Sequence, residues 1–202
     1  LLNMSILSRR SVRPDPARES ELEADAVSSP MPYPVEIAAR KLCKSFNEQQ
    51  MVLHDIALEV APGEIVAIVG ASGCGKTVLL DHLIGLLEPT SGGVYAVDHS
   101  QTELPLLELS TLGDQELDRL RLYWAVVFQR NALFSGTVHE NIALWLREHL
   151  EMPEEEILER ARRALDAVGL DVDDVLEKDR EALSGGMAKR VAIARALAID
   201  PV

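Results

Sequence analysis

Hydrophobic and polar residues change their spacing along the chain, and each spacing predicts an element. Residues 35–46 and 52–60 have the spacing of two strands that pair, and residues 93–98 form another short strand. Residues 64–69 are a short β-branched apolar run, which is typical of a buried strand. Helical spacing follows from residue 77 to residue 84. The pattern therefore predicts a strand, a glycine-rich loop and a helix in direct succession.

The second half of the chain has helical spacing from residue 137 to about residue 181. Thr137 and Glu140 have the spacing of a capping box, which predicts a helix start. Pro153 and the three glutamates after it suit the first turn of a further helix, where the helix dipole favours negative charge. Gly169 predicts the end of that helix. Its expected buried face consists of Ile157, Ala161, Ala164, Leu165 and Val168.

The glycine-rich loop reads Gly70-Ala-Ser-Gly-Cys-Gly-Lys76-Thr77, which is the phosphate-loop pattern G-x-x-x-x-G-K-T. Its glycines permit positive φ angles and let the backbone approach a polyphosphate closely. Backbone N–H groups from about Gly73 to Thr77 then form an anion nest at a helix start. Lys76 is expected to reach the β- and γ-phosphates of ATP, and Thr77 to offer its hydroxyl to Mg²⁺. The alternative is a glycine turn that binds nothing, which the flanking strand and helix disfavour.

A second glycine loop, Ser184-Gly-Gly-Met187, opens another helical run. Ser184 is a good N-cap residue, and Gly185 and Gly186 leave backbone N–H groups exposed at the helix start. This arrangement predicts a second anion site. The alternative is a capped surface helix that follows a glycine turn.

With the first loop upstream of it, the run 183–197 resembles the signature motif of ATP-binding cassette (ABC) proteins. The family motif is usually L-S-G-G-Q, and this chain departs from it at Met187. The resemblance implies an α/β fold of the P-loop NTPase (ABC ATPase) type, with an antiparallel β layer and a helical subdomain. It assigns the ATP-binding domain to residues 35–202, C-terminally incomplete, and the helical subdomain to about 130–184.

The resemblance also assigns roles to Gln129, which lies between the two glycine loops, and to Phe46, which lies upstream of both. Residues 126–129 look like the strand that ends in the family's Q-loop glutamine, here Gln129, which touches Mg²⁺ and the membrane partner. Phe46 lies where the family keeps an aromatic residue that stacks on adenine, and core packing is the alternative. The expected catalytic residues are Lys76 and Gln129, and the expected Mg²⁺ ligands are Thr77 and Gln129. The expected nucleotide-binding residues are Phe46, Gly70, Ser72, Gly73, Gly75, Lys76, Thr77, Val78, Ser184, Gly185 and Gly186.

Two short stretches narrow the resemblance to one subfamily. Residues 128–134 and 140–149, together with the Ser-Gly-Gly-Met sequence, look like the ATPases of Mla/Mce-type lipid transporters. The resemblance implies a phospholipid or another lipid as the transported substrate.

Residues 100–121 are longer than the family's usual connection, and we expect them to pack as an insertion at the edge of the fold. Residues 1–34 are rich in Pro, Ser and charged residues, which predicts a disordered tail.

The composition excludes some classes of function. A net charge of −13 disfavours nucleic acid as a partner, because phosphate backbones attract clustered Lys and Arg. No apolar run reaches the roughly 18–20 residues that span a bilayer. Cys43 and Cys74 do not suggest a disulfide framework, and no histidine spacing suggests a metal beyond the Mg²⁺ of a nucleotide. We therefore expect a cytoplasmic protein, peripheral at the inner face of the cell membrane through a partner.

The resemblance implies partners and a mechanism. Two copies would pair head to tail as a homodimer around two ATP molecules, and a membrane permease subunit would respond to their closure. The family's Walker B strand and catalytic glutamate would follow Val202, so we expect the 202-residue chain alone to be prone to aggregation and to hydrolyse no ATP. The alternatives are an ATP-binding regulatory module without turnover and a soluble ABC ATPase that is not part of a transporter.

Overall fold

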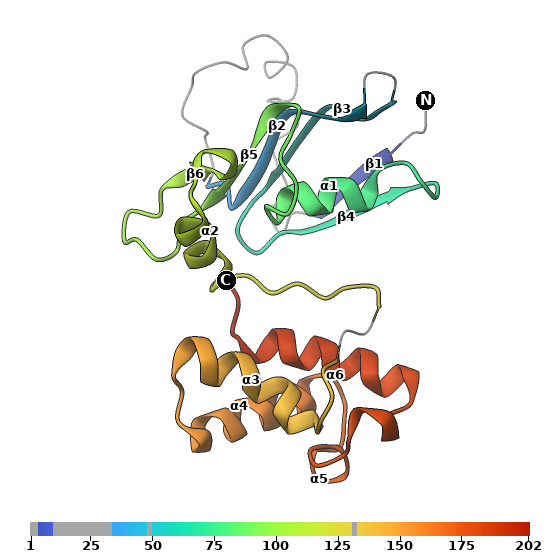
Figure 1. The fold of residues 1–202 in the computed structure, drawn as a ribbon, viewed down its shortest axis with the longest axis vertical. Helices are drawn as coiled ribbons and strands as arrows, with labels where there is room; N and C mark the ends of the chain where they lie inside the picture. Colours follow the sequence, from blue (N-terminus) through green and yellow to red (C-terminus); the bar gives the residue numbers. More distant parts are fainter. Residues whose placement is uncertain (1–3, 10–33, 48–49, 131–132) are drawn as a thin grey trace. The chain divides into compact units, whose positions relative to one another are not determined.

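The structure is a computed structural model that describes residues 4–9, 34–47, 50–130 and 133–202 (Figure 1). The chain forms two compact units, residues 1–117 (unit 1) and residues 118–202 (unit 2). The strands of the described residues all lie in unit 1, and the described residues of unit 2 form helices. Each unit is described by itself.

The larger sheet of unit 1 has four antiparallel strands in the order β3–β2–β5–β6. They are β2 (Ile37–Asn47), β3 (Gln50–Val60), β5 (Ser91–Val97) and β6 (Leu106–Glu108). In the register of β2, Ile37 pairs with Val60 on one side and with Ala96 on the other. These pairings confirm the predicted strand pair and the antiparallel β layer.

The part of the segment 100–121 that belongs to unit 1 contributes a strand at the edge of this sheet. Its strand β6 is the edge strand and pairs only with β5 among the described strands. A 3₁₀ turn at Leu109–Thr111 and helix α2 (Asp114–Arg121) follow β6. The fully buried carboxylate of Asp98 accepts hydrogen bonds from Ser100 N (2.9 Å) and Gln101 Nε2 (2.6 Å). These bonds fix the turn through which the chain enters the segment.

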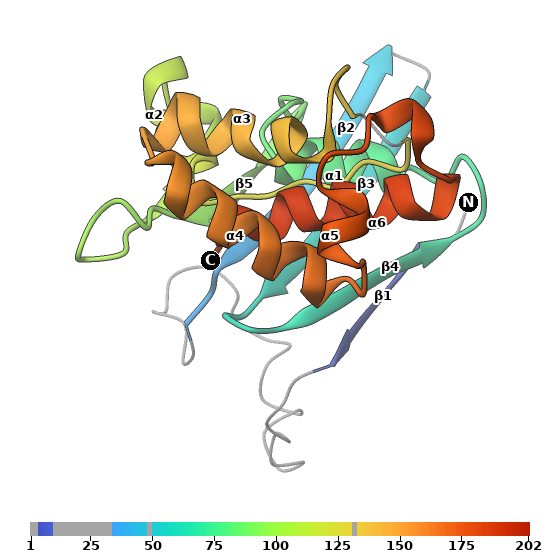
Figure 2. The same cartoon turned by 90° about the horizontal axis from the view of Figure 1, so that it is seen from below.

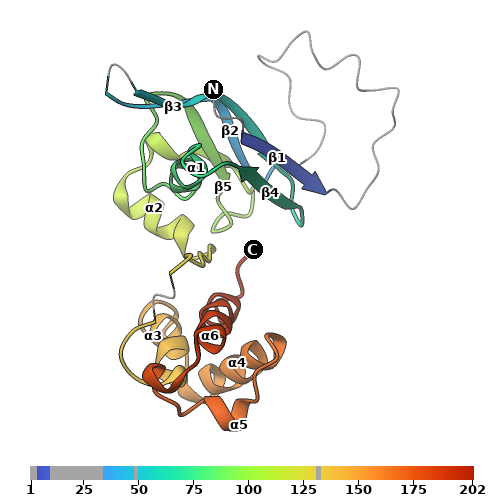
Figure 3. The same ribbon diagram turned by 90° about the vertical axis from the view of Figure 1, so that its right-hand side faces the viewer.

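A second, two-stranded sheet of unit 1 joins β4 (Ile65–Gly70) to β1 (Met4–Arg9) in antiparallel register (Figure 3). We expected no regular structure in residues 1–34, and β1 departs from that prediction. The physical reason is that the edge of β4 presents N–H and C=O groups that an extended segment can satisfy, whatever its composition. Residues 1–3 and 10–33 of the expected tail lie outside the described residues.

Helix α1 (Lys76–Leu83) follows β4 through the glycine-rich loop and packs against the strands of unit 1 with buried residues such as Leu79. It begins after Gly75, whose φ is 97°. A Cβ atom at Gly75 would lie 3.1 Å from Leu53 Cδ2 and 3.1 Å from Val52 Cγ1. Glycine is therefore required at this position both by the positive φ and by close packing against β3.

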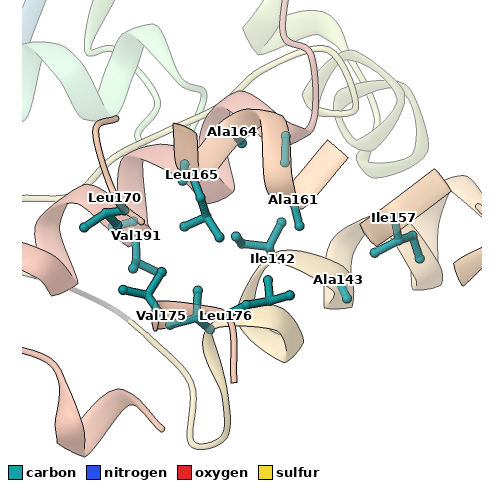
Figure 4. Close-up of a cluster of buried hydrophobic side chains, with 14 of the residues drawn as sticks. Ile142, Ala143, Ile157, Ala161, Ala164, Leu165, Leu170, Val175, Leu176 and Val191 are labelled. Carbon is teal, nitrogen blue, oxygen red and sulfur yellow. The ribbon is translucent and has the colours of Figure 1, made fainter. Parts of the chain in front are cut away.

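Unit 2 consists of α3 (Val138–Leu150), α4 (Glu154–Ala167), α5 (Val172–Val175), a 3₁₀ turn (Arg180–Ala182) and α6 (Gly185–Ala198). Helix α6 packs against α3 and α4 (Figure 2). Their buried side chains form one cluster that includes Ile142, Leu165 and Val191 (Figure 4). We expected the helical subdomain to end at about residue 184, but the packing includes α6 in the same helical unit.

The helix ends of unit 2 follow the local sequence signals. Thr137 Oγ1 accepts from Glu140 N at 3.1 Å while Thr137 N donates to Glu140 Oε2 at 2.8 Å, which confirms the capping box. Pro153 precedes α4, and three glutamates occupy the first turn. Gly169 has a φ of 68° just after α4. The expected apolar face of α4 is buried, with Val168 partly so.

The strand predicted at residues 126–129 is wrong. Residues 124–128 have no regular secondary structure, and Gln129 lies in a bend. A strand is stable only where a neighbour completes its hydrogen bonds. In the described part of unit 2 the only β pairing is an isolated bridge between Thr137 and Asp179, so this apolar run has no strand there to pair with.

We expect replacement of a buried leucine on α3 to destabilise the protein strongly. Leu146 is 0% exposed and belongs to the unit 2 cluster, so Leu146→Ala should cost about 2–5 kcal/mol of the free energy of unfolding, measured by urea denaturation. Leu144 on the same helix is 41% exposed, and Leu144→Ala should cost less than about 0.5 kcal/mol. Equal losses for the two variants would contradict the packing of α3.

Gly75→Ala should destabilise unit 1 more than Gly63→Ala does. Gly63 has a φ of 71° and open space around an added Cβ, so its replacement carries only the cost of a left-handed backbone, about 1–2 kcal/mol. Gly75→Ala adds overpacking against β3, at about 1–3 kcal/mol. Urea unfolding of both variants measures the difference, and equal costs would show that β3 does not constrain the loop.

Candidate functional site

The phosphate loop joins the last residue of β4, Gly70, to the first residue of α1, Lys76. Its outer residues, 70–73, are exposed, whereas Cys74 and Gly75 are buried. Gly73 has a φ of 78°, and an added Cβ there would meet nothing within 4 Å. The loop is thus an exposed backbone arch whose inner end is fixed by packing, which leaves its outer side open to a ligand.

Lys76 folds back over this arch. Its Nζ donates to Gly70 O at 2.9 Å and to Ala71 O at 2.8 Å, and lies 3.8 Å from Cys74 Sγ. An ammonium group held by the loop carbonyls is a point charge at the rim of the arch, where phosphate oxygens of a nucleotide would lie. The loop therefore places the positive charge and the backbone donors on the same few residues.

The start of α1 fits an anionic group such as the phosphates of ATP. No side chain caps Gly75, and no acidic residue lies in the first turn. The N–H groups of a first helical turn have no partners within the helix, so a phosphate can accept from them. Thr77 and Val78 lie in this turn, and Thr77 is exposed. The described residues hold no group of three or more His, Cys, Asp or Glu that could bind a metal.

The signature loop, defined here as Ser184, Gly185 and Gly186, opens α6 in unit 2. Ser184 Oγ accepts from Met187 N at 3.2 Å, which confirms Ser184 as the N-cap. The two glycines are exposed, and Cβ atoms added to them would meet nothing within 4 Å. The side chain of Met187 packs on the hydrophobic cluster of unit 2. This loop offers an uncrowded helix start. Met187, the residue that departs from the family motif, anchors that start to the hydrophobic cluster.

The starts of α1 and α6 share a property that separates them from the other helices. Among the α-helices formed by the described residues, only these two lack an acidic residue in the first turn. Elsewhere the chain supplies its own carboxylates, as with Glu154 of α4. The two glycine loops therefore open helices whose first turns carry no carboxylate of the chain's own.

The remaining expected site residues are Phe46 and Gln129. Phe46 is 56% exposed, with Lys44 Nζ 5.3 Å from its ring centroid, so the alternative of core packing is wrong and stacking on adenine stays a prediction. Gln129 is exposed and belongs to unit 2, whereas Thr77 belongs to unit 1. Their shared role at Mg²⁺ therefore stays a prediction, as do the catalytic roles of Lys76 and Gln129.

Sequence reasoning missed a polar network beside α3. Asn141, which is 2% exposed, accepts from Phe134 N at 2.7 Å and donates to Phe134 O (3.1 Å) and Thr137 O (2.9 Å). Arg180 Nη1 donates to Leu133 O at 2.7 Å. A buried asparagine in the first turns of an amphipathic helix is the one signal that could have indicated this network.

Unit 2 also contains a hollow of about 690 Å³ that is mostly apolar. Phe134, Leu144, Trp145 and Arg195 help to line it, and the guanidinium carbon of Arg195 lies 5.4 Å from the centroid of the Phe134 ring. Burial lowers the pKa of Arg195 from its ordinary value.

No helix in the described ranges is long and apolar enough to cross a membrane.

Comparisons with known proteins agree with this geometry. Residues 53–202 match the family model described as ABC transporter. The chain is 38% identical over 172 residues to the probable ribonucleotide transport ATP-binding protein mkl of Mycobacterium leprae, covering 85% of this chain and 46% of that protein. It is 38% identical over 166 residues to the chloroplastic protein TRIGALACTOSYLDIACYLGLYCEROL 3 of Arabidopsis thaliana, covering 81% of this chain and 44% of that protein. The chain thus spans about half the length of the curated relatives it matches.

Among solved structures, one similar fold is the ATP-binding cassette MJ0796, a dimer in a post-hydrolysis state bound to ADP and Pi. The TM-score is 0.66 at 29% identity, covering 82% of this chain and 70% of that one. The family match, the relatives and the fold agree with the two glycine loops, and the chain belongs to the ABC transporter family as an ATP-binding domain.

Proposed function

We propose that this chain is the nucleotide-binding part of a transporter subunit that couples ATP binding and hydrolysis to transport across a membrane. The observation that carries the proposal is the pair of acid-free, glycine-opened helix starts at α1 and α6. One lies in unit 1 beside Lys76, and the other lies in unit 2 behind Ser184. Both suit phosphate oxygens rather than an apolar ligand.

The residues of the phosphate loop bind and orient the nucleotide. Backbone N–H groups at the start of α1 hold the phosphates, and Lys76 exchanges its loop carbonyls for the β- and γ-phosphate oxygens. Thr77 and Gln129 are the residues that would hold Mg²⁺, and the ion would neutralise charge on the phosphates. Phe46 stacks on the adenine ring, because its exposed face is available beside Lys44.

The signature loop acts on a nucleotide held by a second copy of the chain. Ser184, Gly185 and Gly186 present a helix start to the γ-phosphate bound by the partner's phosphate loop, so two copies enclose two ATP molecules. Support comes from the similar fold of MJ0796, whose structure is described as dimeric and bound to ADP and Pi. Closure on ATP and reopening after hydrolysis then drive a membrane permease, through which the subunit is attached to the membrane.

The hollow of unit 2 supports a permease as the partner. Apolar side chains such as Phe134 and Leu144 are exposed around it, and Arg195 adds a positive charge. Exposed apolar side chains around a hollow suit a helix of another protein better than they suit water. We propose that the permease docks here, at the hollow lined by Val126 and Phe134.

We propose a phospholipid or another lipid as the transported substrate. Support comes from the stretches 128–134 and 140–149, from Met187 in the signature motif, and from the Arabidopsis relative, which is named after a lipid. The mycobacterial relative is named for ribonucleotide transport, which makes a ribonucleotide the competing substrate class.

Lys76→Ala should weaken ATP binding by about 10–100-fold, because it removes two or more charge-assisted hydrogen bonds to phosphate. A fluorescent ATP analogue titrated into the protein measures the dissociation constant. Lys178→Ala removes the same charge from an exposed ion pair with Asp174 in unit 2 and should leave binding unchanged. Equal affinities in all three proteins would refute nucleotide binding at this loop. ATP binding without hydrolysis in the assembled transporter would favour the regulatory module instead.

The substrate proposal predicts lipid transfer that depends on ATP. The protein assembled with its permease in vesicles should move a fluorescent phospholipid to added acceptor vesicles, and it should hydrolyse ATP faster when those acceptor vesicles are present. Added ribonucleotides should change neither the rate of ATP hydrolysis nor the rate of phospholipid transfer. Lys76→Ala in the same vesicles provides the control. Stimulation by ribonucleotides with no lipid movement would overturn the lipid proposal and leave the ATPase role intact.

A further inference from the structure

The signature loop is held at its entrance by a set of hydrogen bonds that no glycine motif requires. The chain reaches Ser184 through the 3₁₀ turn Arg180–Ala182, in which Leu183 N donates to Arg180 O at 3.2 Å. Arg180 therefore lies at the point where the loop leaves the body of unit 2. Its backbone and side chain both contact another segment of the same unit.

That segment is residues 133–137, ahead of α3. Arg180 N donates to Gly136 O at 3.1 Å, and Arg180 Nη1 donates to Leu133 O at 2.7 Å. We call these contacts of Arg180 with Leu133 and Gly136 the entrance clamp. Next to the entrance clamp, Thr137 and Asp179 form an antiparallel bridge, so the segment 133–137 and the 3₁₀ turn lie side by side.

The segment 133–137 is itself rigid. Asn141 makes three hydrogen bonds to it from within the core, and the capping box fixes its last residue. Gly136 has a φ of 115°, and an added Cβ there would overlap Glu140 Oε2 of the capping box. An anchor of this kind transmits its position to whatever is bonded to it.

The ion pair of the Arg180 side chain adds little to the stability of the fold. The side chain is 44% exposed, and its ion pair with Glu181 is between exposed side chains. Backbone hydrogen bonds of 3.1 and 3.2 Å already hold the turn. The guanidinium bond to Leu133 O therefore serves to restrict where the turn, and the glycines after it, can lie.

We propose that Arg180 is a positioning residue for the second nucleotide contact: its guanidinium, bonded to Leu133 O, holds the signature loop in the orientation that meets ATP on a second copy. The inference rests on the proposed ATP-bound dimer. It separates nucleotide binding by one copy from dimerisation of two copies, because the phosphate loop belongs to unit 1 and the entrance clamp to unit 2.

The test compares Arg180→Ala with wild-type protein in two assays with a non-hydrolysable ATP analogue. Arg180→Ala should bind the fluorescent nucleotide as a monomer with unchanged affinity and unfold at the same urea midpoint. Its nucleotide-dependent dimerisation, measured by sedimentation, should weaken by about tenfold. Arg180→Lys keeps one donor and the charge and should recover most of the dimerisation. Arg162→Ala, which removes an exposed arginine paired with Asp173 on the outer side of α4, should dimerise as wild type.

Unchanged dimerisation of Arg180→Ala would overturn the inference, and so would an equal loss for Arg162→Ala, which would show a general effect of charge. A loss of dimerisation that is accompanied by a lower urea midpoint, with no recovery in Arg180→Lys, would show a structural role only. A wild-type protein that binds nucleotide but does not dimerise with it would instead refute the proposed dimer, and the inference with it.

Discussion

The structure depends on one constraint: two helix starts must stay clear of acidic side chains while the residues around them stay fixed. At α1 the constraint is met by Gly75, which is buried against Val52 and Leu53 of β3 and cannot shift without repacking that strand. The antiparallel sheet of unit 1 thereby determines where the first N–H groups of α1 point. The exposed outer part of the loop, including Gly73, is uncrowded and can adapt to a ligand, while the inner end stays fixed by packing.

Unit 2 meets the same constraint by different means. Its α6 begins with Ser184, which caps one N–H group and leaves the glycines uncrowded, while Met187 anchors the first turn to the hydrophobic cluster. The entrance is fixed by hydrogen bonds from Arg180 rather than by close packing of a glycine. A fixed helix start matters more here, because its ligand would be held by another molecule and every degree of freedom lost on docking lowers affinity.

Local signals predicted the parts of the fold that depend on neighbours in sequence. The capping box at Thr137, the buried face of α4 and the strand–loop–helix order around Lys76 all follow from spacings of a few residues. Elements that depend on distant partners were not predictable in this way. The run 126–129 has the composition of a strand but no partner in its unit, whereas Met4–Arg9 lies in a polar tail and pairs with β4. The arginine at position 180 matches no periodic pattern, and only its contacts identify it.

The net charge of −13 repels a polyphosphate from the chain as a whole. Charges beyond about 8 Å are largely screened at physiological salt, so binding depends on the field within a turn of each loop. Each of the described helices α2 to α5 has at least one carboxylate in its first turn, where it complements the helix dipole, and none lies in the first turn of α1 or α6. A distribution of this kind disfavours anions at the other helix starts relative to these two. In the proposed function, specificity for phosphate therefore comes from where acidic residues are omitted as much as from Lys76 itself.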